Sequence, residues 1–218
     1  MGACVTGAEM SRPVDYSLYL VTDRSLALDR ELVDIVAAAV QGGVTVVQIR
    51  EKGAGTREFL ALAQALKALL DPQGIPLIVN DRLDLALACE AAGVHLGHED
   101  LPCDLARRLL GPERLLGVSV STPEEARQAE AAGADYLGVS PIFVTPTKQD
   151  TPAATGLAGL RAIRAVTALP LVAIGGLSAT NAGEVMAAGA DGIAVVSALM
   201  AAADPREAAR ALRSAISR

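Results

Sequence analysis

Residues 131–140 read AAGADYLGVS, and residues 187–197 read AAGADGIAVVS. In both stretches an Ala-rich helical segment reaches a glycine, the residue that most often follows the end of a helix, and an apolar strand-like run comes next. Gly93, after Ala91 and Ala92, stands in a similar phrase and is also expected to end a helix. The recurrence hints at a repeated two-strand unit and predicts an α/β protein whose helices lead into buried strands.

Eight strand candidates alternate with helical patterns along the chain. Several are nearly continuous apolar runs, as expected of parallel strands that are buried on both faces. Helical spacing of apolar residues predicts helices over residues 28–40, beginning with Leu28, and over residues 59–70. The strand candidates are residues 16–22, 44–50, 76–81, 94–97, 115–120, 135–140, 170–175 and 192–197.

Eight such units in about 200 residues leave about 25 residues for each, which predicts a single (β/α)8 TIM barrel. We assign residues 1–15 to a short N-terminal extension and residues 16–218 to the barrel. A doubly wound open sheet is the competing architecture, but no glycine-rich GxGxxG follows the first strand to support it.

The composition excludes several classes of protein. The 218 residues are 51% hydrophobic and 20% charged, which excludes a disordered chain. The net charge of −6 and an aromatic content of 2% argue against a nucleic-acid-binding surface. No apolar run approaches the ~18 residues of a membrane helix, and the first residues lack the pattern of a signal peptide. We therefore expect a cytoplasmic protein that binds neither nucleic acid nor membrane.

Polar residues gather where the predicted strands end, on the face where TIM barrels carry their active sites. Gly175 and Gly176 follow the seventh strand and Ser197 follows the eighth, which is where such barrels hold a phosphate on backbone N–H groups. The hydroxyls of Thr145 and Thr147 could add further donors. This side of the rim is therefore expected to bind a phosphate.

The opposite side of the rim has the residues for a second anion. Arg50, Lys52 and Lys148 carry more positive charge than one monophosphate requires. Asp81 and Asp100 are hard oxygen ligands of the kind that hold Mg²⁺ together with substrate phosphates. The sequence thus predicts a magnesium-bound diphosphate beside the phosphate, and a reaction that expels diphosphate.

Seven short blocks, each near a strand end, resemble the thiamine-phosphate synthase family over the chain from about Tyr16 onward. The resemblance implies a (β/α)8 transferase that joins hydroxymethylpyrimidine diphosphate to a thiazole phosphate, giving thiamine phosphate and diphosphate. The blocks are Gln48-Ile49-Arg50-Glu51-Lys52-Gly53, Asn80-Asp81, His95-Leu96-Gly97-His98-Glu99-Asp100, Gly117-Val118-Ser119, Pro141-Ile142-Phe143, Thr145-x-Thr147-Lys148 and Ile174-Gly175-Gly176.

Position by position, the resemblance implies a site for each ligand and a largely dissociative displacement of diphosphate by the thiazole nitrogen. Mg²⁺ would bind Asp81 and Asp100, and the catalytic residues would be Arg50, Lys52, Ser119 and Lys148. The pyrimidine diphosphate would bind at Gln48, Ile49, Arg50, Glu51, Lys52, Asn80, Ser119 and Lys148. The thiazole phosphate would bind at Thr145, Pro146, Thr147, Gly176, Val196 and Ser197.

Two positions depart from the family's pattern. His98 stands where the family usually has Gln, and Pro146 lies two residues after the position where the family usually has its proline. Because Pro146 has no N–H, its loop lacks one backbone donor for a phosphate. His95 lies inside a strand and is expected in the core or behind the site, so His98 is the better functional candidate of the two histidines.

Two other functions stay open. The related thiazole tautomerase keeps the thiazole-phosphate site without a full diphosphate and metal site, and a non-catalytic phosphate-binding barrel would also be expected to lose the metal carboxylates. The complete set of cations and carboxylates in this chain disfavours both. The expected partners are the two small-molecule substrates, and a homodimer is the candidate assembly.

Overall fold

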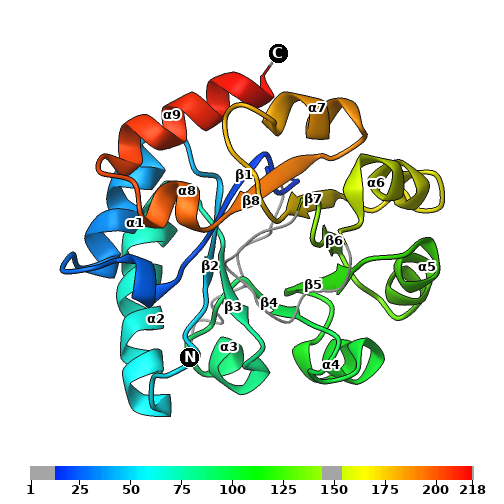
Figure 1. Ribbon diagram of the computed structural model, residues 1–218. Coiled ribbons are helices and arrows are strands. Elements are labelled where there is room, and N and C mark those ends of the chain that lie inside the picture. Colours follow the sequence, from blue (N-terminus) through cyan, green and yellow to red (C-terminus); the bar gives the residue numbers. More distant parts are fainter. Residues whose placement is uncertain (1–12, 144–153, 218) are drawn as a thin grey trace.

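A computed structural model describes residues 13–143 and 154–217. Eight parallel strands close into one barrel in sequence order, and helices surround them (Figure 1). The prediction of a single (β/α)8 TIM barrel is confirmed. The strands are β1 Leu18–Val21, β2 Val46–Ile49, β3 Leu77–Asn80, β4 Gly93–Leu96, β5 Leu115–Val120, β6 Tyr136–Val139, β7 Leu171–Ile174 and β8 Gly192–Val195.

The helices form the outer ring, and α9 packs on α1 so that the two ends of the barrel sequence meet. None of the helices in the described parts of the chain is long and apolar enough to cross a membrane. The α-helices are α1 Leu32–Gln41, α2 Thr56–Leu70, α3 Leu83–Ala88, α4 Cys103–Leu110, α5 Pro123–Ala131, α6 Gly156–Arg164, α7 Ala182–Ala187, α8 Ser197–Met200 and α9 Pro205–Ile216; short 3-10 helices are η1 Arg24–Leu26 and η2 Asp71–Gln73.

Six of the eight observed strands are shorter than their predicted ranges, five of them at both ends and β8 at its carboxyl end alone. At the carboxyl ends, the residues outside the strands begin the loops that carry the site. Thr22, for example, lies beyond β1, and its Oγ1 accepts a hydrogen bond of 3.0 Å from the N–H of Arg50, which lies beyond β2. The loops that carry the site are therefore bonded to one another as they leave the barrel.

Two local predictions were wrong. Leu28 is not part of α1, which begins at Leu32; Leu28 has a positive φ of 55° and a 78% exposed side chain, so its match to the helical spacing was accidental. Gly93 does not end a helix, because α3 already ends at Ala88 and Gly93 is the first residue of β4. It lies so close to β5 that a Cβ there would approach the carbonyl oxygen of Leu115 to 2.1 Å.

Alternate strand residues face two separate apolar regions, as the two-residue period of a strand requires. Outward-facing residues such as Leu20 and Val47 pack against the helices in the larger cluster. Inward-facing residues fill the barrel interior, where all three tyrosines of the chain meet. The interior cluster consists of Tyr16, Tyr19, Val21, Val46, Ile78, Tyr136, Val172 and Ala194.

The two sequence copies that carry AAGAD form the same turn at the amino-terminal ends of β6 and β8. Gly133 and Gly189 have φ values of +94° and +107°, and the stem of an arginine from the preceding even-numbered helix lies against each of them. The aspartate that follows accepts a backbone N–H from the neighbouring strand and pairs with the arginine. We call these contacts the floor clamps: Arg107–Asp135–Leu116 N and Arg164–Asp191–Leu171 N.

Candidate active site

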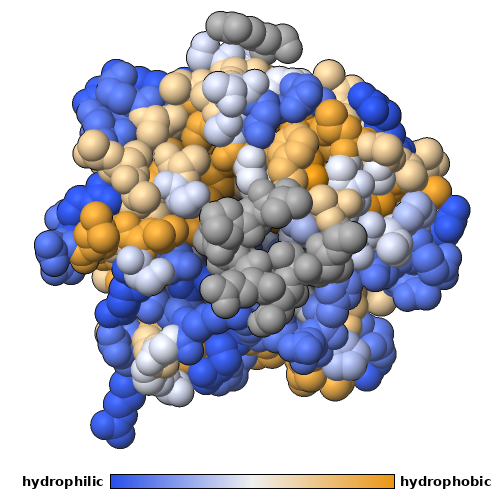
Figure 2. All heavy atoms as spheres, in the orientation of Figure 1, coloured by the Kyte–Doolittle hydropathy of each residue, from blue (hydrophilic) through white to orange (hydrophobic). Residues whose placement is uncertain are grey.

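A cavity of about 580 Å³ opens where the strands end at their carboxyl side. Figure 2 views the molecule from this side and shows a largely hydrophilic surface around α2 and α3. Residues from every strand end line the cavity, so the predicted face of the barrel is the hollowed one. The sequence-predicted residues that line it are Gln48, Arg50, Lys52, Asn80, Asp81, Asp100, Ser119, Gly176, Val196 and Ser197.

Two predicted residues do not line this cavity. Ile49 is fully buried between the sheet and the helices, since its position in β2 points outward. Glu51 has the same outward direction, and its side chain is only 3% exposed. Thr145, Pro146, Thr147 and Lys148 lie outside the described residues.

Asp81 and Asp100 form a carboxylate pair on one side of the cavity. Asp81 follows β3 with a φ of +62°, and Asp100 accepts a 2.7 Å hydrogen bond from the N–H of Gly97 in the loop after β4. Burial, together with the hydrogen bond to Asp100 and its charge, raises the pKa of Asp81 to about 6, although Lys52 and Arg50 act in the opposite direction. Two half-buried carboxylates in contact favour either a shared proton or a bound cation.

This pair fits Mg²⁺. The described residues contain no group of three or more His, Cys, Asp or Glu side chains that could hold a metal ion by themselves. Mg²⁺ does not require such a group, because it is usually held by one or two carboxylates with water and substrate phosphates. Asp81 and Asp100 would hold it at the edge of the cavity.

Arg50 and Lys52 face the same side of the cavity. The Arg50 guanidinium lies 3.4 Å from Asp23 Oδ2, and its backbone N–H is bound by Thr22. Asp23 in turn caps η1 by accepting the N–H of Ser25. The loop after β1 therefore fixes Arg50, which is only partly exposed, beside the carboxylate pair.

Glu51 supports this segment from behind. Its Oε2 accepts a 2.9 Å hydrogen bond from Arg24 Nε, and Arg24 also pairs with Glu58 of α2. Burial raises the pKa of Glu51 against the opposing effect of Arg24. The ion pairs join η1, the loop after β2 and α2, which holds Arg50 and Lys52 between them.

The opposite side of the cavity is built from backbone. Gly175 and Gly176 follow β7 with φ values of +108° and +67°, a conformation that other residues rarely adopt. Asn181 donates to the carbonyl oxygen of Gly176 at 2.9 Å and so fixes the turn. Val196 and Ser197 follow β8, and Ser197 begins α8. This side can offer backbone N–H groups and a hydroxyl to an anion.

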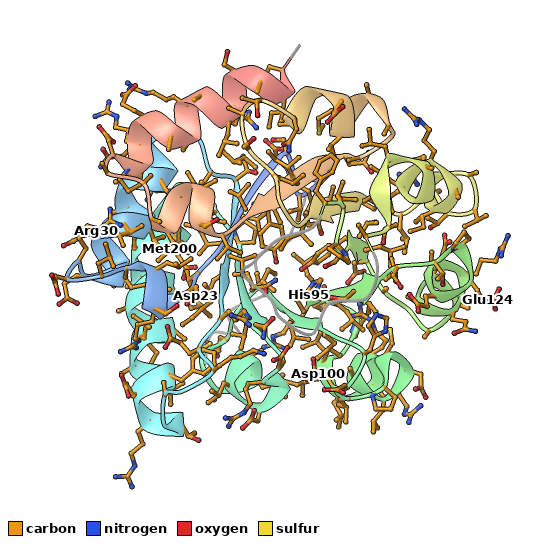
Figure 3. All side chains as sticks on the ribbon, viewed as in Figure 1. Asp23, Arg30, His95, Asp100, Glu124 and Met200 are labelled. Atoms are coloured by element: carbon orange, nitrogen blue, oxygen red, sulfur yellow. The ribbon has the colours of Figure 1, made fainter. Side chains whose placement is uncertain are left out.

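The two histidines lie at different depths. His98 is on the loop after β4, half exposed, with Nε2 4.0 Å from Glu125 Oε2. His95 lies in the barrel interior, and Figure 3 shows it nearer the barrel axis than Asp23 and Asp100, which lie at the rim. Its ring is hydrogen-bonded to Ser119 and to Tyr136. Tyr19 and Tyr136 were missed from the sequence, although each stands at an inward-facing strand position.

Comparisons with known proteins agree over most of the chain. A family model described as thiamine monophosphate synthase matches residues 18–199. The thiamine-phosphate synthase of Albidiferax ferrireducens is 61% identical over 199 residues, which cover 91% of this chain and 91% of that protein. That of Chloroflexus aurantiacus is 55% identical over 204 residues, 94% of each chain.

One solved structure agrees with these relatives, and a second shares only the fold. A thiamine phosphate pyrophosphorylase from Pyrococcus furiosus superimposes with a TM-score of 0.86 at 42% identity, covering 94% of this chain and 96% of the other. A 3-hexulose-6-phosphate synthase superimposes with a TM-score of 0.66 at 18% identity, over 92% of this chain and 99% of that one, which is a likeness of fold alone.

Proposed function

The chain belongs to the thiamine monophosphate synthase family and makes thiamine phosphate, and we propose that it does so in the cavity at the carboxyl ends of the strands, by displacement of diphosphate with Mg²⁺ as cofactor. One observation carries the proposal. The cavity has a carboxylate pair with Arg50 and Lys52 on one side, and a glycine turn with Ser197 on the other. These are complementary surfaces for two different anions.

The charged side takes the pyrimidine diphosphate. Mg²⁺ bound to Asp81 and Asp100 would neutralise charge on the diphosphate as it leaves. Arg50 and Lys52 contact the same diphosphate, and the family resemblance adds Lys148 to them. Gln48 and Asn80 surround the pyrimidine end, deeper in the barrel, and Ser119 faces the oxygen that joins the pyrimidine methylene to the diphosphate.

The backbone side takes the thiazole phosphate. Gly176, Val196 and Ser197 offer donors at the strand ends, and the resemblance adds Thr145, Pro146 and Thr147 from the loop after β6. The two phosphate groups then bind at opposite sides, which leaves the pyrimidine methylene carbon and the thiazole nitrogen between them.

The reaction needs positioning more than proton transfer. The bond from the methylene carbon to the diphosphate oxygen breaks and its electron pair leaves with diphosphate. The pyrimidine amino group stabilises the cation, and the lone pair of the thiazole nitrogen forms the new C–N bond. No proton is lost, so the cations and hydrogen-bond donors that line the cavity need only neutralise charge and position the two substrates.

An assay of both products tests the proposal. Chelator-treated enzyme is given both substrates, and thiamine phosphate and diphosphate are measured with and without added Mg²⁺. We expect no turnover without the ion and equal amounts of the two products with it. Full turnover in excess chelator would contradict the magnesium assignment, and unequal products would contradict the displacement. The homodimer, the cytoplasmic location and the boundary at residue 16 stay predictions.

A further inference from the structure

A continuous chain of hydrogen bonds crosses the barrel interior beneath the cavity. Gln48 Nε2 donates to the Tyr19 hydroxyl at 2.9 Å, and the hydroxyls of Tyr19 and Tyr136 lie 2.9 Å apart. The Tyr136 hydroxyl lies 3.1 Å from His95 Nδ1, and His95 Nε2 lies 3.0 Å from Ser119 Oγ. We call these five side chains the interior relay. Its two ends, Gln48 and Ser119, both line the cavity.

The strands leave room for the relay at two glycines. A Cβ at Gly117 would lie 2.4 Å from the Tyr136 hydroxyl and 2.5 Å from His95 Nδ1. A Cβ at Gly138 would lie 2.8 Å from His95 Cε1. Both glycines sit beside relay residues in the strand register, Gly117 opposite His95 and Gly138 opposite Ser119. Any larger residue at either position would displace the His95 ring, which connects Tyr136 to Ser119.

Counting donors gives the relay a direction. An amide nitrogen only donates, so Tyr19 accepts from Gln48 and must pass its own proton to Tyr136. With a neutral His95 ring, Tyr136 then donates to Nδ1, and the ring proton on Nε2 is donated to Ser119. Burial raises the pKa of both tyrosines well above the usual value, so each keeps the one proton that this count requires. Ser119 is left with its hydroxyl proton available to the cavity.

We propose that Tyr19, Tyr136 and His95 are positioning residues that couple the orientation of the Gln48 amide to the donor direction of the Ser119 hydroxyl. With Nε2 turned into the relay, Gln48 offers its Oε1 to a donor on the pyrimidine, and Ser119 donates to the oxygen of the departing diphosphate. A pyrimidine with an acceptor in that place turns the amide over, reverses each bond and points the Ser119 proton at His95. The inference rests on the proposed placement of Gln48 and Ser119 at the pyrimidine diphosphate.

The tautomer of His95 tests the coupling in the ligand-free enzyme. The chain has two histidines, so nitrogen-15 spectra of the imidazoles show two sets of signals, and His98→Gln identifies which set is which. We expect the Nε2–H tautomer of His95 in the wild type. In Gln48→Glu the ionised carboxylate can only accept, so the relay reverses and His95 takes the Nδ1–H tautomer, three hydrogen bonds from the substitution. The wild-type tautomer in an ionised Gln48→Glu would overturn the proposal.

Kinetics test whether the relay reaches the reaction. Tyr136→Phe and Tyr19→Phe interrupt it, so Ser119 keeps its hydroxyl but loses its fixed direction, and we expect kcat to fall about tenfold with the KM for the thiazole phosphate unchanged. Tyr16→Phe is the matched control. The ring centroids of Tyr16 and Tyr136 lie 4.8 Å apart, so the two rings pack together, but the Tyr16 hydroxyl is outside the relay. An equal loss in all three variants would show a packing effect and overturn the inference.

A further variant separates this inference from the proposed function. Ser119→Ala removes the last donor of the relay. Full kcat in Ser119→Ala would overturn the placement of Ser119 at the leaving group, and the relay's role with it. A large loss in Ser119→Ala with wild-type kcat in Tyr136→Phe would overturn the relay alone.

Discussion

The two ends of the barrel use charge in opposite ways. At the amino-terminal end, each floor clamp pairs an arginine with an aspartate and binds a backbone N–H, so every charge has an opposite partner. At the carboxyl end, Asp81 and Asp100 are placed against one another, and Asp81 has a left-handed backbone conformation. An arrangement that destabilises the free protein persists where a ligand requires it. The comparison separates residues that stabilise the barrel from residues that we propose to bind the substrates and the metal ion.

The largest effect should follow from removing the carboxylate pair. We expect Asp81→Ala and Asp100→Ala to lower kcat by about a thousandfold, because no metal then offsets the charge of the leaving diphosphate. Asp81→Ala should not lower the free energy of unfolding, since it relieves repulsion, whereas Asp100→Ala also removes the acceptor of the Gly97 N–H and should lower it by about 1 kcal/mol. Thiamine phosphate production and urea denaturation measure the two quantities.

Asp104→Ala is the matched control for this pair, because it removes an exposed carboxylate that is paired with Arg108 on α4. Its activity should stay at the wild-type level. Wild-type turnover in the Asp81/Asp100 double variant would contradict the assignment of both residues.

Lys148 should give the next largest effect. Leaving-group charge develops only as the C–O bond breaks, so Lys148→Ala removes a contact made mainly in the transition state. For one charge-assisted contact we expect a loss of roughly 2–4 kcal/mol, on the order of a hundredfold in kcat. Steady-state kinetics with both substrates would check it. If kcat holds and only the affinity for thiazole phosphate falls, Lys148 belongs to the other anion.

Removing a floor clamp should have the opposite effect: it should lower the stability of the protein and leave its activity unchanged. Asp135→Ala removes the acceptor of the Leu116 N–H and the carboxylate partner of Arg107, and should lower the free energy of unfolding by about 2 kcal/mol. Asp191→Ala makes the same change in the second copy, so the two losses should be similar. Urea denaturation measures the stability, and kcat of the folded protein should not change. A loss of kcat without a loss of stability would remove the distinction between the two ends.

Within the cavity, substitutions on the backbone side should have a smaller effect, and this effect should be on the binding of one substrate only. Ser197→Ala removes one hydroxyl donor and should weaken thiazole-phosphate binding by roughly 1–2 kcal/mol. Gly176→Val should weaken it too, because a branched side chain crowds a backbone with positive φ. Calorimetric titration with each ligand should show the pyrimidine diphosphate binding almost as before in the presence of Mg²⁺. Equal losses for both ligands would mean one merged site.

Strand ends were predictable because a parallel barrel brings all of them to one face, so Arg50, Asp81 and Asp100 could be placed together without coordinates. The outward direction of Ile49 and Glu51 also had a signal, since they alternate with Gln48 and Arg50 along the end of β2 and the two residues that follow it. The resemblance to the family was carried over for the whole block from Gln48 to Lys52, so residues of both directions were assigned to the site.

The contact between Tyr19 and Tyr136 could not be predicted, because it joins residues 117 positions apart and depends on the register of strands on opposite sides of the barrel. Leu28 shows the opposite case, a prediction that the sequence pattern favoured and the structure contradicts. Its spacing fits a helix, but the loop between η1 and α1 holds it in a left-handed conformation that no spacing pattern reveals. Local periodicity therefore predicts elements well, whereas contacts between elements need the register.

The smallest expected effect is the pH dependence of stability, which should arise at the carboxyl end of the barrel and not at the amino-terminal end. The pKa of Asp81 is about 6 in the folded protein and 3.8 without the fold, so between about pH 4 and pH 6 the native state binds a proton that the unfolded chain has released. The unfolding free energy of the metal-free enzyme should therefore fall as the pH rises through this window. Because the proposed Mg²⁺ site is the ionised pair, the gain in Tm on adding Mg²⁺ should be larger above pH 6 than below pH 5. Calorimetry of the wild type and of Asp81→Asn checks this, because the variant should lose both the slope and most of the metal's gain, whereas Asp135→Asn should keep them. A gain in Tm that is the same at both pH values would show that the stabilising ion does not bind at Asp81.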